Sequence, residues 1–195
     1  MKIAVISDIH DNAHNLVIAL EQINEYWVEK TIFLGDFCGA AIAWILAKSP
    51  VKVTAIWWNN DWDKSLITKF ALTEGSNLDI WFDVFDTMEI DGKKIFLSHY
   101  PLLAKPMAKS GDFDAVFYWH DHTKHKEFIW DCLVLNPGEI WAYKTGVATF
   151  AIYDTKNNDA EIIEINNSIT TNTKESQDKF NEIWYKFNQQ ESHKH

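Results

Sequence analysis

The chain has 195 residues, of which 47% are hydrophobic and 24% charged, so it suits one domain with a substantial core and is not a disordered chain. A net charge of −10 argues against a protein that coats nucleic acid non-specifically. No run of ~18 apolar residues predicts a membrane-spanning helix, and the opening MKIAVISDIH lacks the features of a signal peptide, so we expect a cytoplasmic protein.

The basic residues have an unusual composition, because all 18 of them are lysines. Bidentate hydrogen bonding of phosphate by an arginine guanidinium is therefore impossible in this chain. A site for an anionic substrate must instead use metal ions, backbone N–H groups, or asparagine, histidine and lysine side chains.

Strand and helix patterns alternate along the first sixty residues, which predicts a parallel sheet with crossover helices. In such sheets, polar residues just beyond the strand ends point into the ligand crevice. The predicted elements are a strand over Lys2–Ser7, a helix with Leu16, Leu20, Ile23 and Trp27 on its apolar face and Asn12 as its cap, a strand over Thr31–Leu34, a helix over Ala40–Lys48, and a strand over Val51–Trp57.

Short β-like segments fill the second half, and Asp91-Gly92 between two of them is a strong hairpin signal. We expect one domain over residues 1–165. The predicted strands are Ile80–Phe85, Met88–Ile90, Lys93–His99, Ala115–Trp119, Glu127–Trp130, Cys132–Leu135, Val147–Tyr153 and Glu161–Ile165.

Residues 166–195 read as a polar linker followed by an amphipathic helix, for which Asn172 and Glu175 make a plausible capping box. This helix would pack on the domain or on a second subunit, so a homo-oligomer is one expectation. Its apolar positions follow helical spacing and are Phe180, Ile183, Trp184 and Phe187.

Five polar segments stand at the ends of predicted strands. Together they supply two carboxylates, one amide oxygen and four imidazoles, a mixed donor set that suits Mn, Fe or Zn better than Ca or Mg alone. An aspartate in such a place can also cap a helix, so each segment alone is weak. The segments are Asp8-Ile9-His10, Gly35-Asp36, Asn59-Asn60-Asp61, Ser98-His99 and His120-Asp121-His122.

The order D-x-H, G-D, N-x-D, H and H-x-H resembles the calcineurin-like metallophosphoesterase superfamily, above all its small single-domain bacterial and archaeal phosphodiesterases. The resemblance covers roughly residues 1–154, and Asn136-Pro137-Gly138 is similar to a turn that follows the last ligand motif in those proteins. It implies an α/β fold in which two mixed β-sheets pack as a sandwich flanked by helices.

The resemblance also implies two divalent metal ions, with Mn²⁺ first and Fe, Ni or Zn as alternatives. Two such ions would clamp a phosphate ester and activate a water bridging between them. The implied ligands are Asp8, His10 and His122 for one ion, Asn59, His99 and His120 for the other, and Asp36 as the bridge; the catalytic candidates are Asp36, Asn59, Asn60 and His99.

Departures from the family pattern affect the expected substrate. Many members have a proton-donating histidine where this chain has Asn60, so we expect a phosphodiesterase more than a monoesterase. Trp58 and Trp119 replace family glycines, and with Tyr100 they are candidates for a pocket that stacks a nucleotidic or other small planar ester. The alternative function is a protein-interaction scaffold of the same fold with weak or no catalysis.

Overall fold

The structure is a computed structural model that describes residues 1–57, 61, 63–81 and 85–170, together with positions 174, 178–179, 181–183, 185–186 and 189. The helices are α1 (Ala13–Glu25), α2 (Ala40–Ala47), α3 (Lys64–Ala71) and α4 (Pro101–Ser110). The strands are β1 (Lys2–Ile6), β2 (Lys30–Phe33), β3 (Val53–Ile56), β4 (Leu78–Trp81), β5 (Phe85–Ile90), β6 (Lys93–Ser98), β7 (Ala115–Tyr118), β8 (His125–Ile129), β9 (Cys132–Asn136), β10 (Thr149–Asp154) and β11 (Asp159–Glu164).

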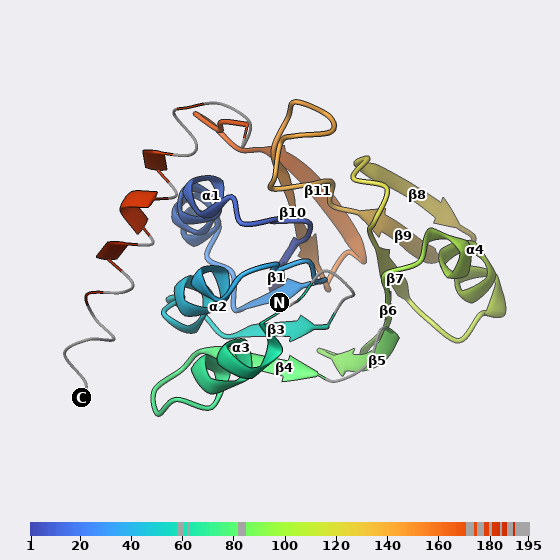
Figure 1. Cartoon of the computed structure of the whole chain (residues 1–195). Helices are drawn as coiled ribbons and strands as arrows, with labels where there is room; N and C mark the ends of the chain where they lie inside the picture. The colour runs from blue at the N-terminus through green and yellow to red at the C-terminus, as the bar shows by residue number, and fades with distance from the viewer. Residues whose placement is uncertain are drawn as a thin grey trace.

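Two mixed sheets pack against each other, with α1, α2 and α3 on one side and α4 on the other (Figure 1). The first sheet has the order β11-β10-β1-β2-β3-β4, in which β1 to β4 run parallel and β10 is antiparallel to β1. The second has the order β5-β6-β7-β9-β8, with parallel β6-β7-β9 at its centre. The expected α/β sandwich of two mixed sheets is confirmed.

The apolar runs predicted as strands are buried because both faces of the first sheet are covered. In β1, Ala4 and Ile6 belong to the core shared with the helices, while Ile3 and Val5 belong to the core between the two sheets. This alternation follows the two-residue period of a strand. A third, smaller core joins α4 to the outer face of the second sheet.

The first predicted helix is confirmed at its start, where the Asn12 side chain accepts a hydrogen bond from the Asn15 amide. Trp27 was wrongly placed on its apolar face. The helix ends at Glu25, and Trp27 follows with φ 56° and 86% of its surface exposed. The apolar spacing extends past the end of the helix, but the backbone leaves the helical conformation after the C-cap residue Tyr26, so Trp27 faces solvent.

The second half confirms the hairpin at Asp91-Gly92, where β5 and β6 pair antiparallel. The single strand predicted over Ile80–Phe85 is wrong, because β4 ends at Trp81 in the first sheet and β5 begins at Phe85 in the second. Helices α3 and α4 were not anticipated. In α4, Pro101 occupies the first turn, where proline is tolerated. Pro106 lies inside the helix, where proline is normally unfavourable, so the sequence did not indicate a helix here.

The described tail positions after 174 are helical, and Ile183 packs against the core that contains α1 and α2. The other residues of the predicted tail helix, Phe180, Trp184 and Phe187, and its capping pair, Asn172 and Glu175, lie outside the described residues. Among the helices of the described chain, none is both long and apolar enough to cross a bilayer.

Replacing Gly138 with alanine is expected to destabilise the fold by roughly 2–4 kcal/mol, from overpacking and left-handed backbone strain. Gly138 has φ 85°, and an added methyl group would overlap the Thr149 hydroxyl and lie 3.3 Å from the Lys124 Cβ. Gly146→Ala is the matched control, since Gly146 also has positive φ but no neighbour within 4 Å of an added Cβ. Urea denaturation of both variants checks the difference, and equal losses of stability would contradict it.

Candidate metal centre

The polar segments predicted to carry chemistry emerge where strands of the two sheets end. Asp8 and Asp36 follow the parallel strands β1 and β2, and the two histidines His120 and His122 follow β7. All four residues adopt left-handed backbone conformations, with φ between 49° and 86°. Such conformations cost of order 1–3 kcal/mol each in non-glycine residues and cluster at functional sites.

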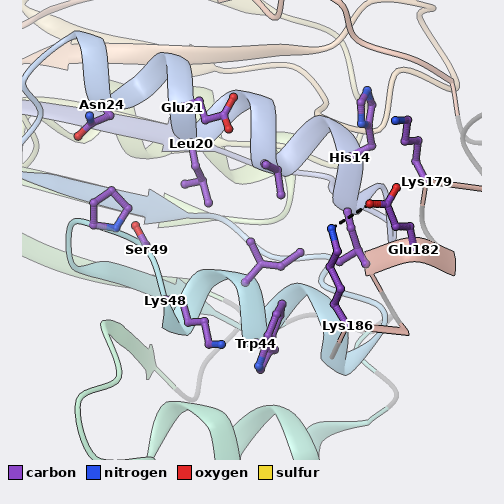
Figure 2. Close-up of a pocket in the computed structure, with 14 residues that line it drawn as sticks. His14, Leu20, Glu21, Asn24, Trp44, Lys48, Ser49, Lys179, Glu182 and Lys186 are labelled. Carbon is purple, nitrogen blue, oxygen red and sulfur yellow. Dashed lines mark hydrogen bonds and ion pairs between the residues drawn. The ribbon is translucent and has the colours of Figure 1, made fainter. Parts of the chain in front are cut away.

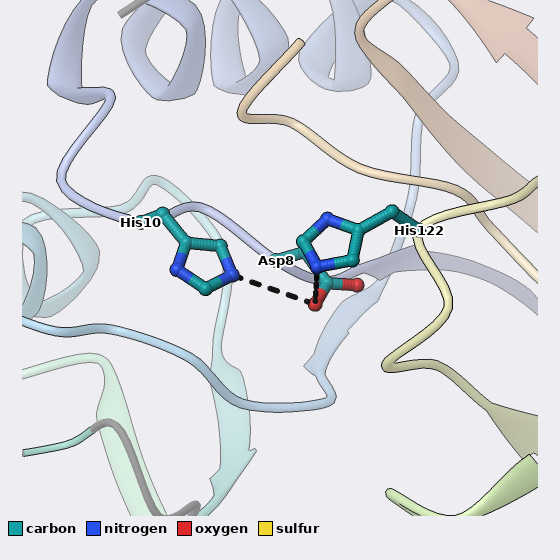
Figure 3. A group of neighbouring side chains, drawn as sticks. All are labelled: Asp8, His10 and His122. Atoms are coloured by element: carbon teal, nitrogen blue, oxygen red, sulfur yellow. Dashed lines mark ion pairs between the residues drawn. The ribbon is translucent and has the colours of Figure 1, made fainter. Parts of the chain in front are cut away.

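Asp8, His10 and His122 form a compact group whose candidate ligand atoms all lie within 4.8 Å of one another (Figure 3). His10 Nε2 lies 3.7 Å and His122 Nε2 lies 3.6 Å from the same oxygen, Asp8 Oδ1. These distances exceed the ~2.7–3.2 Å of a hydrogen bond. They suit donors that share one ion at bond lengths of ~2.0–2.2 Å.

Asp36 joins this group through its Oδ2 atom, which is 3.4 Å from His10 Nε2. Asp8 and Asp36 are buried, and within the described part of the chain both Asp8 carboxylate oxygens and Asp36 Oδ1 lack hydrogen-bond partners. Buried carboxylates without partners are costly, and they are found paired or bound to metals. The carboxylate oxygens and imidazole nitrogens collected here fit a divalent transition metal ion.

Burial and neighbouring charges perturb the pKa values of this group. Burial raises the pKa of Asp8. For His10, burial favours the neutral ring, but the contacts with Asp36, Asp8 and Cys38 outweigh it and raise the pKa to about 11. A metal ligand must be deprotonated, so a proton on His10 and a metal ion would compete for Nε2.

His99 and His120 form a second contact, with His99 Nε2 2.5 Å from His120 Nδ1. Burial, followed by repulsion from His120, His122 and His10, lowers the pKa of His99 to about 2. His99 is therefore neutral near pH 7, as a metal ligand must be.

The structure assigns supporting roles to two residues: Glu139, which was missed from the sequence, and Asp61, which stood in the N-x-D motif without an assigned role. Glu139 is fully buried and its Oε2 atom lies 2.8 Å from His122 Nδ1. Asp61 accepts hydrogen bonds from the amides of Phe37 and Cys38, which fixes the loop after Asp36. Glu139 directly follows the Asn136-Pro137-Gly138 turn, so its position next to that motif was the available signal.

Of the other predicted site residues, Asn59, Asn60 and Trp58 lie outside the described residues. Tyr100 is 44% exposed and contacts His99 edge-on, at 5.5 Å between ring centroids. The expectation that Trp119 lines a substrate pocket is wrong, because this residue is fully buried in the core between the sheets. Its ring packs edge-to-face against His99 from the core side, with 4.7 Å between the ring centroids.

A groove of about 570 Å³ lies away from this centre, between α1, α2 and the described tail positions (Figure 2). It is lined by Leu20, Trp44 and Lys48, and on the tail side by Lys186, which pairs with Glu182 at 2.9 Å. None of the described candidate ligands lines it. The volume of this groove is therefore no reason to place the catalytic site in it.

The sequence and the fold match known proteins over most of the chain. The model of the calcineurin-like phosphoesterase superfamily domain matches residues 1–158. Phosphodiesterase MJ0936 of Methanocaldococcus jannaschii is 34% identical over 158 residues, which are 80% of this chain and 94% of that protein.

Two solved structures extend the comparison. The structure of an archaeal phosphodiesterase has a TM-score of 0.76 and 32% identity, and the match covers 84% of this chain and 99% of that one. The phosphoesterase Yfce from E. coli shares the fold, with a TM-score of 0.61, 19% identity, and coverage of 85% and 100%. This agreement confirms the resemblance found in the motifs, and the chain belongs to the calcineurin-like phosphoesterase superfamily.

Proposed function

We propose that this protein is a phosphodiesterase with two divalent metal ions, Mn²⁺ first among them, that hydrolyses a small phosphate diester. The carrying observation is the convergence of Asp8, His10 and His122 on one point. Asp36 lies beside them, with Oδ2 3.4 Å from His10 Nε2 and with Oδ1 lacking a hydrogen-bond partner among the described residues. The archaeal relative at 34% identity carries the name phosphodiesterase.

The donor atoms divide into two groups that would hold the two ions. Asp8, His10 and His122 would bind one, and His99 and His120 with Asn59 would bind the other, while Asp36 would contact both. Two divalent ions supply Lewis acidity, which offsets phosphate charge and lowers the pKa of a bound water. This also explains how a chain whose basic residues are all lysines can accept a phosphate ester without arginine.

The residues of the chain contribute orientation and exclusion of water. Asp8 and His99 are fully buried, and Trp119 covers His99 from the core side. The Trp141 ring stacks on His10 with 4.2 Å between centroids, which restricts the orientation of that imidazole. Ligands held in this way lose little freedom on binding, which favours affinity for the metal.

The test is hydrolysis of bis-p-nitrophenyl phosphate by purified protein after chelation and after addition of Mn²⁺, Ni²⁺ or Zn²⁺ in turn. We expect activity only with added metal, and two ions bound per chain. A protein that binds no metal and hydrolyses nothing in any of these ions would overturn the proposal and favour the scaffold alternative. Cyclic nucleotides, dinucleotides and phospholipid headgroup esters then define the substrate.

Replacing Asn60 with histidine is expected to raise hydrolysis of alkyl phosphate monoesters relative to diesters. An asparagine amide cannot donate a proton to a leaving alkoxide at neutral pH, whereas histidine can. General acid catalysis contributes ~10²–10⁴-fold when well placed, so even partial placement gives a measurable change. Rates on p-nitrophenyl phosphate, an alkyl monoester and the diester are compared, and an unchanged monoester-to-diester ratio would contradict the explanation.

A further inference from the structure

The loop after β9 is bound to the end of β1, the strand that delivers Asp8. The Ser7 hydroxyl donates to the Gly138 carbonyl oxygen at 2.6 Å, and the Trp141 amide donates to the Asp8 carbonyl oxygen at 3.0 Å. Between these contacts, the Ile140 amide donates to the Ser7 carbonyl oxygen at 3.1 Å. Glu139 is therefore held at a fixed distance from the proposed metal ligands.

Both carboxylate oxygens of Glu139 are occupied. Oε1 accepts hydrogen bonds from the Thr145 amide at 2.7 Å and from the Thr145 hydroxyl at 2.8 Å, and Oε2 faces His122 Nδ1 at 2.8 Å. Thr145 thus prevents the carboxylate from rotating away. A fully buried carboxylate with this set of donors is fixed in one orientation.

The contact with Glu139 determines which nitrogen of His122 carries hydrogen. A carboxylate only accepts, so Nδ1 must be the donor, and in the neutral ring Nε2 then holds the lone pair. Nε2 is the atom that lies 3.6 Å from Asp8 Oδ1, in the group proposed to bind metal. His10 lacks such a partner, because its Nδ1 faces the Cys38 sulfur at 3.5 Å.

We propose that Glu139 is a positioning residue, which keeps Nδ1 of His122 protonated and aims Nε2 at the ion shared with Asp8 and His10. The inference rests on the proposed metal centre. Partners of this kind behind a metal-binding histidine typically change metal affinity by ~10–100-fold. The geometry concentrates the effect on the ion of Asp8, because Glu139 makes no described contact with His99 or His120.

The experiment compares the wild-type chain with Glu139→Ala and Glu139→Gln, and measures Zn²⁺ affinity and stoichiometry by competition with a chelating dye. In Glu139→Ala we expect the affinity of the subsite formed by Asp8, His10 and His122 to fall ~10–100-fold, while the other ion stays bound. Glu139→Gln should recover part of this loss, since its amide oxygen can still accept from Nδ1. Lys124→Ala, which removes an exposed ion pair with Glu164 two residues from His122, is the control and should bind as the wild type.

Proton NMR of the Zn²⁺-loaded proteins provides a second measurement that a purely structural role would not move. The wild type should show a slowly exchanging, downfield Nδ1–H resonance from His122, which is lost in Glu139→Ala and retained in Glu139→Gln. Wild-type and Glu139→Ala proteins with equal Zn²⁺ affinities would overturn this inference and leave the proposed function standing. Failure of the wild type to bind any ion would overturn both.

Discussion

Replacing Asp36 with asparagine is expected to reduce phosphodiester turnover by ~10²–10³-fold, the scale on which a single electrostatic element of an active site contributes. Asp36 is buried, its Oδ2 lies 3.4 Å from His10 Nε2, and its Oδ1 has no hydrogen-bond partner among the described residues. The asparagine side chain has nearly the same shape but carries no charge and turns one ligand oxygen into a donor. Because Asp36 is the proposed bridge, both ions should bind more weakly.

The measurement is the rate on bis-p-nitrophenyl phosphate together with metal content by elemental analysis. Asp63→Asn is the matched control, because Asp63 caps α3 by accepting a hydrogen bond from the Leu66 amide, and asparagine caps helices equally well. The control should retain full metal content and rate. A near-normal rate for Asp36→Asn would contradict the bridging assignment.

Local patterns were sufficient to predict the first three strands and the two helices between them. Apolar runs at β1, β2 and β3, separated by amphipathic segments, leave few arrangements other than a parallel sheet with crossover helices. The placement of Asp8 and Asp36 at one edge of that sheet follows directly, because parallel strands end on the same side.

The order of the second sheet could not be predicted in the same way. In it, β9 pairs with β7 and leaves β8 at the edge, although β8 comes first in the chain. Short strands of similar composition allow several such orders, and only long-range packing selects one. The family resemblance provided the sandwich, which the residues alone did not.

Adjacent residues at a strand end face opposite ways, but this alternation does not say which of the two faces the core. The position of Trp119 therefore could not be predicted from the sequence. His120 is exposed at the site, whereas Trp119 before it is buried between the sheets. Glu139 was missed for a different reason. Its role depends on the loop that folds back onto Ser7 and Asp8, contacts more than 130 residues apart in the chain.

Replacing Asp8 with asparagine is expected to change thermal stability in opposite directions, relative to the wild type, without and with bound metal. In excess chelator, the variant should unfold at the same temperature as the wild type or higher. The Asp8 carboxylate is fully buried and lacks hydrogen-bond partners within the described chain, so removing its charge removes a cost of burial. The neighbouring imidazoles of His10 and His122, 3.7 and 3.6 Å away, offset only part of that cost.

Saturating Mn²⁺ should then stabilise the wild type by ~2.7 kcal/mol at one hundred times the dissociation constant, which corresponds to about 5–10 °C for a chain of this size. The variant should gain less than half as much, since it has lost a charged ligand of the ion. Thermal unfolding with and without metal measures both effects, and the exposed Asp112→Asn serves as the control. A buried carboxylate that serves to bind a cation destabilises the fold only while that cation is missing. If Asp8→Asn were instead less stable than the wild type in chelator, and gained as much stability from Mn²⁺, Asp8 would be a structural residue.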